Sequence, residues 1–435
     1  MKHSIRHQLR SIDGTRHDFR RLKCVSAVKA LVVFTLTIAS LFGIGNPSYA
    51  GVSVYAQIRT VFYNDVWSSP DGVNWTKHAA PPWPSGPCDS GPMDRGMIVG
   101  SVTFQGKLWV IGGGSYWSTN PDCAGIGSNQ VWSWDGIDGH AWVLETAAAP
   151  WIARTYHTVI VFNNQIYVMA GLENDALGEA ALCDVWSSPD GVHWSAVSNP
   201  APWPGRHAMS TWAYNGTVYI EGGTGDIPVS GPCPTSTGSK YPSNDVWKYS
   251  KQESGEYAWT NVLQEGQAPF VPHDAAGALV YNGLMWLIGG WHPTLYKPMV
   301  TTNEVWNSTD GAHWHLIKPN TYIPGKYNPL TDWEGRHMAG WVVFNNKMWI
   351  VGGDSNSGHY QSDIWNSSDG VTWNKVTDSP QWALPSQGGG PRVLHYTVAF
   401  DNGISNQIYV IGGQTWPETI TYPLHAIING LLLDH

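Results

Sequence analysis

Short apolar stretches alternate with turn-forming residues along most of the chain, and they do not recur at helical spacing. A typical unit is an apolar stretch, an Asn-Asn or Asn-Gly pair, a second apolar stretch and a glycine pair, as in residues 344–353. Such Asn pairs favour tight hairpin turns with positive φ. The pattern therefore predicts six β-hairpins, at residues 104–113, 162–171, 214–223, 281–290, 344–353 and 400–413.

A second pattern also occurs six times and ends in Val-Trp or Ile-Trp, at residues 65–67, 130–132, 184–186, 245–247, 304–306 and 363–365. Most copies continue through an Asp-Gly turn to another tryptophan, as from Ser187 to Trp194. This pattern predicts a third and a fourth strand. The repeating unit is then four antiparallel strands, which recur about every 60 residues between Gly112 and Gly412.

Repeated four-stranded units of this length are typical of propeller blades. The glycine pair, the acidic-Val-Trp strand and the later tryptophan resemble the kelch repeat over residues 61–413. The first copy, residues 63–75, lacks a first hairpin, and the last, residues 395–413, lacks a third strand. We therefore expect an all-β, six-bladed kelch-type β-propeller over residues 51–413, closed by N-terminal strands that complete the last blade. Residues 414–435 are expected to form a C-terminal tail.

Residues 1–50 have the pattern of a secretory signal peptide, with a basic start, an apolar run from about residue 30 to 44 and a small-residue end at Ala50. We expect cleavage after Ala50 and export to the periplasm or medium, and the alternative is an uncleaved membrane anchor. The segment holds eight of the 24 Lys/Arg and two of the 33 Asp/Glu, which leaves the remainder with a net charge of −15. That charge argues against nucleic acid or an anionic membrane as a partner.

Four cysteines follow the segment, and an even number in an exported chain suggests two disulfides. We expect the pairs Cys88–Cys123 and Cys183–Cys233. No Cys-x-x-Cys spacing supports a zinc site, and we expect neither a metal nor a cofactor.

One basic position recurs in the connections between predicted blades, eight residues before the aromatic that precedes the hairpin turn. It is occupied by Arg154, Arg206, His273, Arg336 and Arg392, with Arg95 one residue out of register. One hypothesis is a positive ring at the channel rim that binds an anionic ligand, because guanidinium groups bind carboxylates and phosphates bidentately. The alternative is that these arginines tie loops to backbone carbonyls as part of the repeat.

Three tryptophans directly follow the glycine pairs and open the long connections, which often carry function. These are Trp117, Trp291 and Trp416. Their rings could stack on sugars, or they could anchor the loops. Trp134, Trp212 and Trp341 also have no place in the repeat.

The sequence as a whole favours a secreted, monomeric, non-catalytic propeller that binds a glycan or a protein through its long-loop face. The alternative is a cofactor-independent carbohydrate enzyme, because the overall plan is similar to that of bacterial N-acetylneuraminate epimerases, which act on an acidic sugar. The plan is also similar to the propeller domain of galactose oxidase, but no mature cysteine stands in a short motif with Tyr and His for a copper site.

Overall fold

A computed structural model describes residues 53–57, 61–82, 101–115, 126–175, 178–225, 233–234, 242–292, 301–323, 327–355, 360–387, 389–415 and 419–423. The chain divides into two units, one of residues 1–55 with 421–435 and one of residues 56–420. Among the described residues, β1 (Ser53–Gln57) pairs with β33 (Thr419–Pro423). The predicted signal peptide lies outside the described residues, and no helix among the described residues has the length and hydropathy to cross a membrane.

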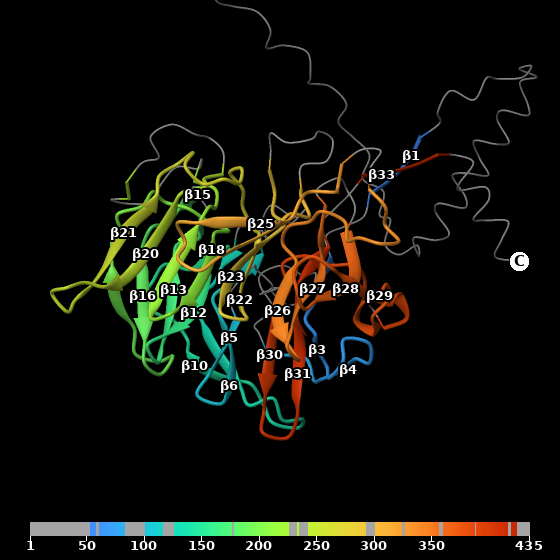
Figure 1. The fold of residues 1–435 in the computed structure, drawn as a ribbon. Coiled ribbons are helices and arrows are strands. Elements are labelled where there is room, and N and C mark those ends of the chain that lie inside the picture. Colours follow the sequence, from blue (N-terminus) through green and yellow to red (C-terminus); the bar gives the residue numbers. More distant parts are fainter. Residues whose placement is uncertain are drawn as a thin grey trace, which may run out of the picture. The chain divides into compact units, whose positions relative to one another are not determined.

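In the larger unit, the described strands form six four-stranded antiparallel sheets, each named by its first strand (Figure 1). The β5 sheet contains β5 (Ser101–Phe104), β6 (Lys107–Ile111), β9 (Val131–Trp134) and β10 (Val143–Thr146). The β12 sheet contains β12 (Thr158–Phe162), β13 (Gln165–Met169), β16 (Val185–Ser188) and β17 (Ser195–Ser198). The β18 sheet contains β18 (Ser210–Tyr214), β19 (Thr217–Glu221), β20 (Val246–Lys251) and β21 (Tyr257–Leu263).

The other three sheets follow the same order of strands. The β22 sheet contains β22 (Gly277–Tyr281), β23 (Leu284–Ile288), β24 (Val305–Ser308) and β25 (Trp314–Lys318). The β26 sheet contains β26 (Gly340–Phe344), β27 (Lys347–Asp354), β28 (Tyr360–Ser367) and β29 (Asn374–Thr377). The β30 sheet combines the two ends of the unit, in the order β30 (Tyr396–Asp401), β31 (Asn406–Ile411), β3 (Val66–Ser69) and β4 (Thr76–Lys77).

The described residues also form shorter elements in the connections. These are β2 (Val61–Phe62) with β32 (Gln414–Thr415), β7 (Gly114–Ser115) with β8 (Ile126–Gly127), and β11 (Arg154–Thr155) with β14 (Leu172–Asp175) and β15 (Gly178–Ala181). The described helical turns are both 3-10, η2 (Gln381–Ala383) and η3 (Pro385–Gln387). The all-β prediction is confirmed.

The first strands of the six sheets contact one another in chain order, β5 to β12, β18, β22, β26 and β30, and β30 contacts β5. The hairpin turns within each sheet form as the sequence predicts. Asn345 and Asn346 have φ of 46° and 53°, the left-handed conformation that Asn tolerates. The first strands therefore gather around one common centre, and the later strands of each sheet lie outside them.

Glycine in the Asp-Gly turns lets each of four sheets lie against the sheet before it. In the β12 sheet, a Cβ on Gly191 would lie 2.6 Å from Cη2 of Trp109 in the β5 sheet. Gly311 meets Tyr219, Gly370 meets Trp286, and Gly72 meets Trp349 in the same way. Ser188 and Asp190 stabilise the Gly191 turn, because their side chains accept hydrogen bonds from the backbone N–H groups of residues 190–193. The Asp-Gly pairs thus serve both turn geometry and packing between sheets.

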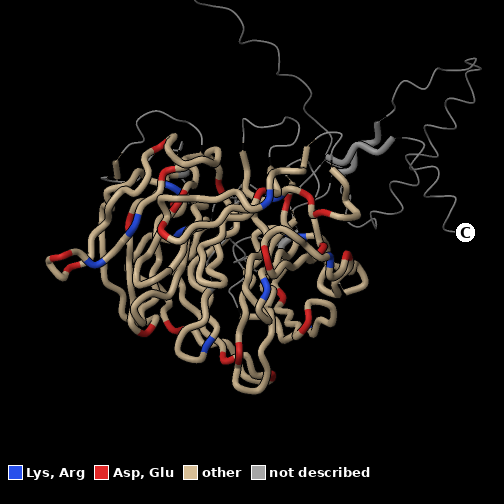
Figure 2. The backbone as a smooth tube through the Cα atoms, in the orientation of Figure 1, with Lys and Arg blue, Asp and Glu red and all other residues tan. Residues whose placement is uncertain are grey.

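Apolar clusters fill the spaces between neighbouring sheets. One cluster joins Phe162, Met169 and Trp203 of the β12 sheet and its following connection to Val218 and Ile220 of the β18 sheet. Both faces of most sheets are therefore buried, which accounts for the low charge of 13% of residues. Figure 2 shows Lys, Arg, Asp and Glu scattered singly along the backbone rather than gathered in blocks.

Candidate functional site

Four of the predicted ligand-binding arginines form buried ion pairs inside their own sheets. Arg154 Nη1 and Nη2 donate to Asp184 Oδ1 and Oδ2 at 2.6 and 2.7 Å, and Nη1 also donates to the carbonyl of Ala170 at 2.9 Å. The same arrangement recurs in three other sheets, as Arg206–Asp245, Arg336–Asp363 and Arg392–Asp65. Each of the four aspartates also accepts a hydrogen bond from the indole N–H of the tryptophan two residues on, as Asp184 does from Trp186.

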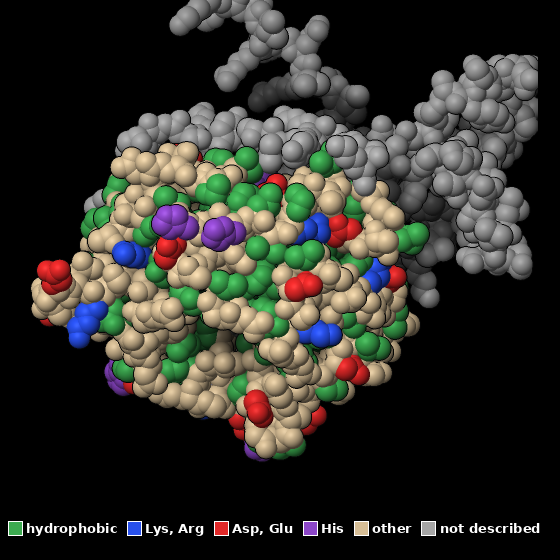
Figure 3. Space-filling view, in the orientation of Figure 1, with side chains coloured by type: hydrophobic (Ala, Val, Ile, Leu, Met, Phe, Trp, Pro, Cys, Tyr) green, Lys and Arg blue, Asp and Glu red, His purple; other side chains and the backbone are tan. Residues whose placement is uncertain are grey.

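These ion pairs leave no open positive ring at the four described arginines. Their side chains are 0 to 3% exposed, and each charge is neutralised by an aspartate. Burial alone would raise the pKa of Asp184, but the Arg154 guanidinium outweighs burial and lowers it. The arginines therefore follow the alternative interpretation, in which they tie loops to backbone carbonyls. Arg95 lies outside the described residues, and on the face in Figure 3 the charged side chains lie scattered among hydrophobic and uncharged ones.

His273, which replaces the arginine in the β22 sheet, is also buried and faces Glu221 of the β18 sheet at 3.1 Å. Trp291 is half-buried, and its backbone bridges Asp274 and Thr301. Trp117 and Trp416 lie outside the described residues, as do Cys88 and Cys123. The other expected disulfide is confirmed, because the structure joins Cys183 and Cys233.

Two residues beyond the arginine or His273, each of five connections holds a non-glycine residue in the left-handed conformation. These residues are Tyr156, Ala208, Ala275, Met338 and Leu394, with φ from 49° to 60°. Their backbones are linked in series: Ala208 N–H donates to the carbonyl of Tyr156, and Ala275, Met338 and Leu394 each donate to the residue before them in this order, at 2.8 to 3.2 Å. These hydrogen bonds hold the starts of the first strands in a fixed arrangement. The sequence gives no signal for this chain of bonds, because none of the five is glycine.

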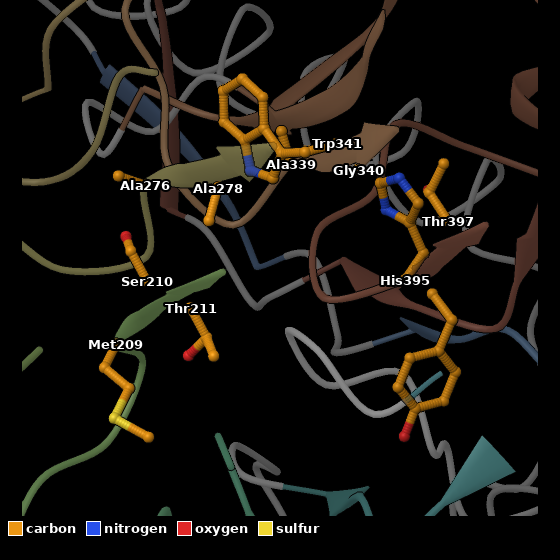
Figure 4. A pocket seen from close by; sticks show the side chains of 11 residues that line it. Met209, Ser210, Thr211, Ala276, Ala278, Ala339, Gly340, Trp341, His395 and Thr397 are labelled. Atoms are coloured by element: carbon orange, nitrogen blue, oxygen red, sulfur yellow. The ribbon is translucent and has the colours of Figure 1, made fainter. Parts of the chain in front are cut away.

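A cavity of about 140 Å³ begins directly after these linked residues, at the starts of β18, β22, β26 and β30 (Figure 4). It exists because the third residue after the arginine or His273 is small in two neighbouring sheets. That residue is His157 in the β12 sheet, Met209 in the β18 sheet and His395 in the β30 sheet, but Ala276 and Ala339 in the β22 and β26 sheets. One water needs roughly 15 Å³ by this measure, so the cavity has room for a small ligand.

Trp341 forms the largest wall of this cavity. Its indole lies against Gly277 of β22, where a Cβ would come within 2.6 Å of Cε3. Figure 4 shows Trp341 and Thr211 on one side of the open space and Thr397 and His395 on the other. Gly340, at the start of β26, leaves room for Thr397, whose Cβ would lie 2.6 Å from an added Cβ. The sequence therefore places an aromatic face and small residues around one space.

Polar atoms without partners line the cavity. Trp341 Nε1, Thr211 Oγ1 and Thr397 Oγ1 are buried and have no hydrogen-bond partner among the described residues. Trp212 Nε1 donates to the carbonyl of Trp286 at 3.0 Å, whereas Nε1 of Trp333, which packs on Trp341, also has no partner among the described residues. A buried donor left without a partner costs about 1–3 kcal/mol, so a ligand that accepts this bond gains correspondingly.

The described residues that line the cavity include no Asp, Glu, Lys or Arg. His395 adjoins it, and burial, with a smaller contribution from Arg392, lowers its pKa to about 3, so that the imidazole is neutral at pH 7. Among the described residues, no group of three or more His, Cys, Asp or Glu is placed to hold a metal ion. The geometry suits an uncharged, hydroxylated ligand with an apolar face.

In the sequence, Trp341 stands out only as a tryptophan that the repeat does not explain. A usable signal was present, because residues 276–278 and 339–340 are all Ala or Gly where other copies carry larger side chains. Small residues in two consecutive copies, followed by an extra tryptophan, indicate where the side chains of the repeat leave a cavity.

No protein-family model matches the chain. The chain is 26% identical over 244 residues to the Leucine-zipper-like transcriptional regulator 1 homolog of Drosophila melanogaster, which covers 54% of this chain and 23% of that protein. It is 25% identical over 299 residues to a Kelch domain-containing protein of Saccharolobus solfataricus, which covers 60% of this chain and 36% of that protein. The chain thus spans only about a quarter to a third of these curated relatives.

Among solved structures, that of YjhT matches with a TM-score of 0.51 at 16% identity, covering 78% of this chain and 95% of that chain. Together with the repeated four-stranded sheets and the kelch relative, this match decides the fold. The chain has a propeller-like fold, and its repeats are similar to kelch repeats. For such a propeller, a match at this identity establishes the fold alone, and function must be argued from the site.

Proposed function

We propose that this kelch-type propeller is an exported, monomeric binding module whose central cavity takes one uncharged sugar unit of a glycan. The proposal includes six blades and ring closure. Six four-stranded sheets, the mixed β30 sheet and the cyclic contacts of the first strands support it. The Cys183–Cys233 bond is compatible with export, because disulfides persist in oxidising compartments.

The observation that carries this proposal is the Trp341 indole, with its unpaired Nε1 beside the cavity. An indole face packs on the C–H face of a sugar ring, and its N–H can donate to a ring or hydroxyl oxygen. Thr211 and Thr397 hydroxyls can exchange hydrogen bonds with other hydroxyls of the same ring. A mostly apolar pocket with a few converging polar groups is the usual form of a small-ligand site.

The charge of the wall favours an uncharged sugar over an acidic one. No Lys or Arg is among the described residues that line the cavity, and the four described arginines are already paired with aspartates. A sugar carboxylate would therefore lose its hydration without gaining a partner. The described lining also offers no carboxylate for acid–base catalysis, and on this ground we favour binding over the acidic-sugar epimerase alternative. We therefore move the proposed site from the long-loop face to the cavity.

A glycan array with the full-length chain tests the proposal. We expect binding to neutral glycans, a loss of at least about tenfold in Trp341→Ala, and loss of binding in Ala278→Leu, which fills the cavity. Val280→Leu is the matched control, because Val280 lies on the same strand, is 40% exposed and does not line the cavity. All variants are checked for cooperative unfolding.

Equal binding by the wild-type chain and folded Ala278→Leu would overturn the cavity as the site. Selective binding of acidic glycans, unaffected by Trp341→Ala, would instead support the acidic-sugar alternative at another surface.

A further inference from the structure

Two residues at the seam between the β18 and β22 sheets depart from the repeat together. Glu221 ends β19, where the other five sheets carry an apolar residue, namely Ile111, Met169, Ile288, Val351 and Ile411. His273 stands where four sheets carry the buried arginine. The β22 sheet therefore lacks the Arg–Asp pair of its neighbours and has a contact between sheets in its place.

This contact is fully buried. His273 Nε2 lies 3.1 Å from Glu221 Oε2, and the two side chains are 2% and 0% exposed. Neither carboxylate oxygen of Glu221, nor His273 Nε2, makes a hydrogen bond of ordinary geometry with any described residue, so the 3.1 Å contact is the polar contact recorded for them. An ionised carboxylate in this position depends on His273 alone, since burial of an unpaired charge costs several kcal/mol.

Hydrogen-bond direction fixes how many protons the pair must hold. His273 Nδ1 lies 2.9 Å from the carbonyl of Val271, which can only accept, so Nδ1 carries a proton. Nε2 lies 3.1 Å from a carboxylate oxygen, and neither atom has a hydrogen-bond partner elsewhere among the described residues. A proton on one of these two atoms makes their contact attractive, whereas without it two electron-rich atoms would lie 3.1 Å apart in a buried seam.

We propose that Glu221 and His273 form a proton-binding site that retains one shared proton at pH 7.5, and that loss of this proton at alkaline pH destabilises the seam between the β18 and β22 sheets. This site is separate from the cavity and does not depend on what the cavity binds.

The surrounding ionisable groups do not supply another partner. Arg206 and Asp245 are paired with each other. Asp274 accepts from Thr224 Oγ1. His292 Nδ1 must donate to the carbonyl of Pro272, and Nε2 contacts Thr302 Oγ1, so both nitrogens are occupied. His337 Nδ1 likewise bonds the carbonyl of Asp354.

The pKa directions agree with the geometry. Burial raises the pKa of Glu221, and the nearby His273 only partly offsets that rise. Burial alone would lower the pKa of His273, but the Glu221 carboxylate outweighs burial and raises it. Burial, with help from charged His273, lowers the pKa of His292 to about 3, so His292 stays neutral.

The folded state therefore binds more protons than the unfolded state above about pH 6.5, the ordinary pKa of histidine. The contribution of the pair to stability is present below that pH and is lost as the pH rises through the folded pKa. One extra proton corresponds to a tenfold fall in the folding equilibrium constant per pH unit.

Urea unfolding of the full-length chain between pH 6.5 and 8.5 tests this proposal. In Glu221→Gln the amide can donate to Nε2 of a neutral His273, so the contact survives without the extra proton. We expect the wild-type folding constant to fall relative to Glu221→Gln by up to about tenfold per pH unit. Glu253→Gln, in an exposed turn, removes a carboxylate elsewhere and should behave as the wild type.

Parallel pH profiles for the wild type and Glu221→Gln would overturn the proposal. An independent measurement needs no variant to fold: NMR of the wild-type chain at pH 7.5 should show either the His273 ring or the Glu221 carboxyl in its protonated form. Both groups in their deprotonated forms would also overturn it.

Discussion

The buried arginines are conspicuous in the sequence but have a structural role, whereas the residues of the central cavity are inconspicuous and form the proposed binding site. Four charges stand out in register in the sequence, at Arg154, Arg206, Arg336 and Arg392. In the structure, each forms a buried ion pair with an aspartate of the same repeat. The described cavity wall consists of small residues, Met209, His395, Tyr396 and one extra tryptophan, none of which stands out in the sequence as a charge in register. In this repeat protein, the residues that recur in most copies stabilise the repeating unit itself.

The departures from the repeat are where new chemistry becomes available. Ala276 and Ala339 stand where His157, Met209 and His395 provide larger side chains, and the space they leave is the cavity. Glu221 and His273 replace an apolar residue and an arginine, and they create a buried ion pair between sheets. The comparison can be tested by changing one region and measuring the property assigned to the other.

The largest effect is expected from Arg336→Met. It leaves Asp363 largely buried without its cation, and removal of one partner of a buried pair typically costs about 3–5 kcal/mol. Urea unfolding should show this loss, while the protein that remains folded binds its sugar with unchanged affinity. If the variant kept its stability but lost binding, Arg336 would have to be part of the ligand site.

A smaller effect is expected from Gly340→Ala, at the cavity wall. The added Cβ would lie 2.6 Å from Thr397 Cβ and 2.9 Å from His395 Nε2, so the β30 strand must shift. Overpacking of this kind costs about 1–3 kcal/mol. We also expect weaker sugar binding, because Thr397 moves. Thermal unfolding and titration calorimetry measure the two effects, and unchanged binding after a clear loss of stability would separate Thr397 from the site.

The smallest effect on stability is expected from Trp341→Phe. Phenylalanine keeps an aromatic face but lacks the N–H, which has no partner in the free protein. Unfolding free energy should change by less than about 0.5 kcal/mol, while affinity should fall by roughly tenfold for one lost hydrogen bond. Titration calorimetry distinguishes this from the larger loss expected for Trp341→Ala. Equal affinity in Trp341→Phe would mean that the indole contributes only its face.

Much of the fold followed from the sequence because turn chemistry is local. Asn345-Asn346 and the Asp-Gly pairs form the turns that they predict, and the hairpins pair as expected. The union of β3 and β4 with β30 and β31 was also predicted, from the incomplete first and last copies. Cys183–Cys233 was correctly paired.

The site did not follow, because it depends on which side chains meet between copies. Arg154 and Asp184 are 30 residues apart, and their bidentate pairing requires the β12 sheet to be assembled. The left-handed residues from Tyr156 to Leu394 are imposed by hydrogen bonds between connections, against the usual preference of residues other than glycine. The cavity, likewise, arises where individual copies differ from one another, so the pattern that the copies share does not reveal it.

The most direct test is a crystal structure of the chain with the neutral monosaccharide that the glycan array selects. The account predicts the sugar ring on the face of Trp341, between β18, β22, β26 and β30, with an oxygen within hydrogen-bond distance of Nε1. A sugar bound elsewhere, with the Trp341 cavity holding only water, would contradict it.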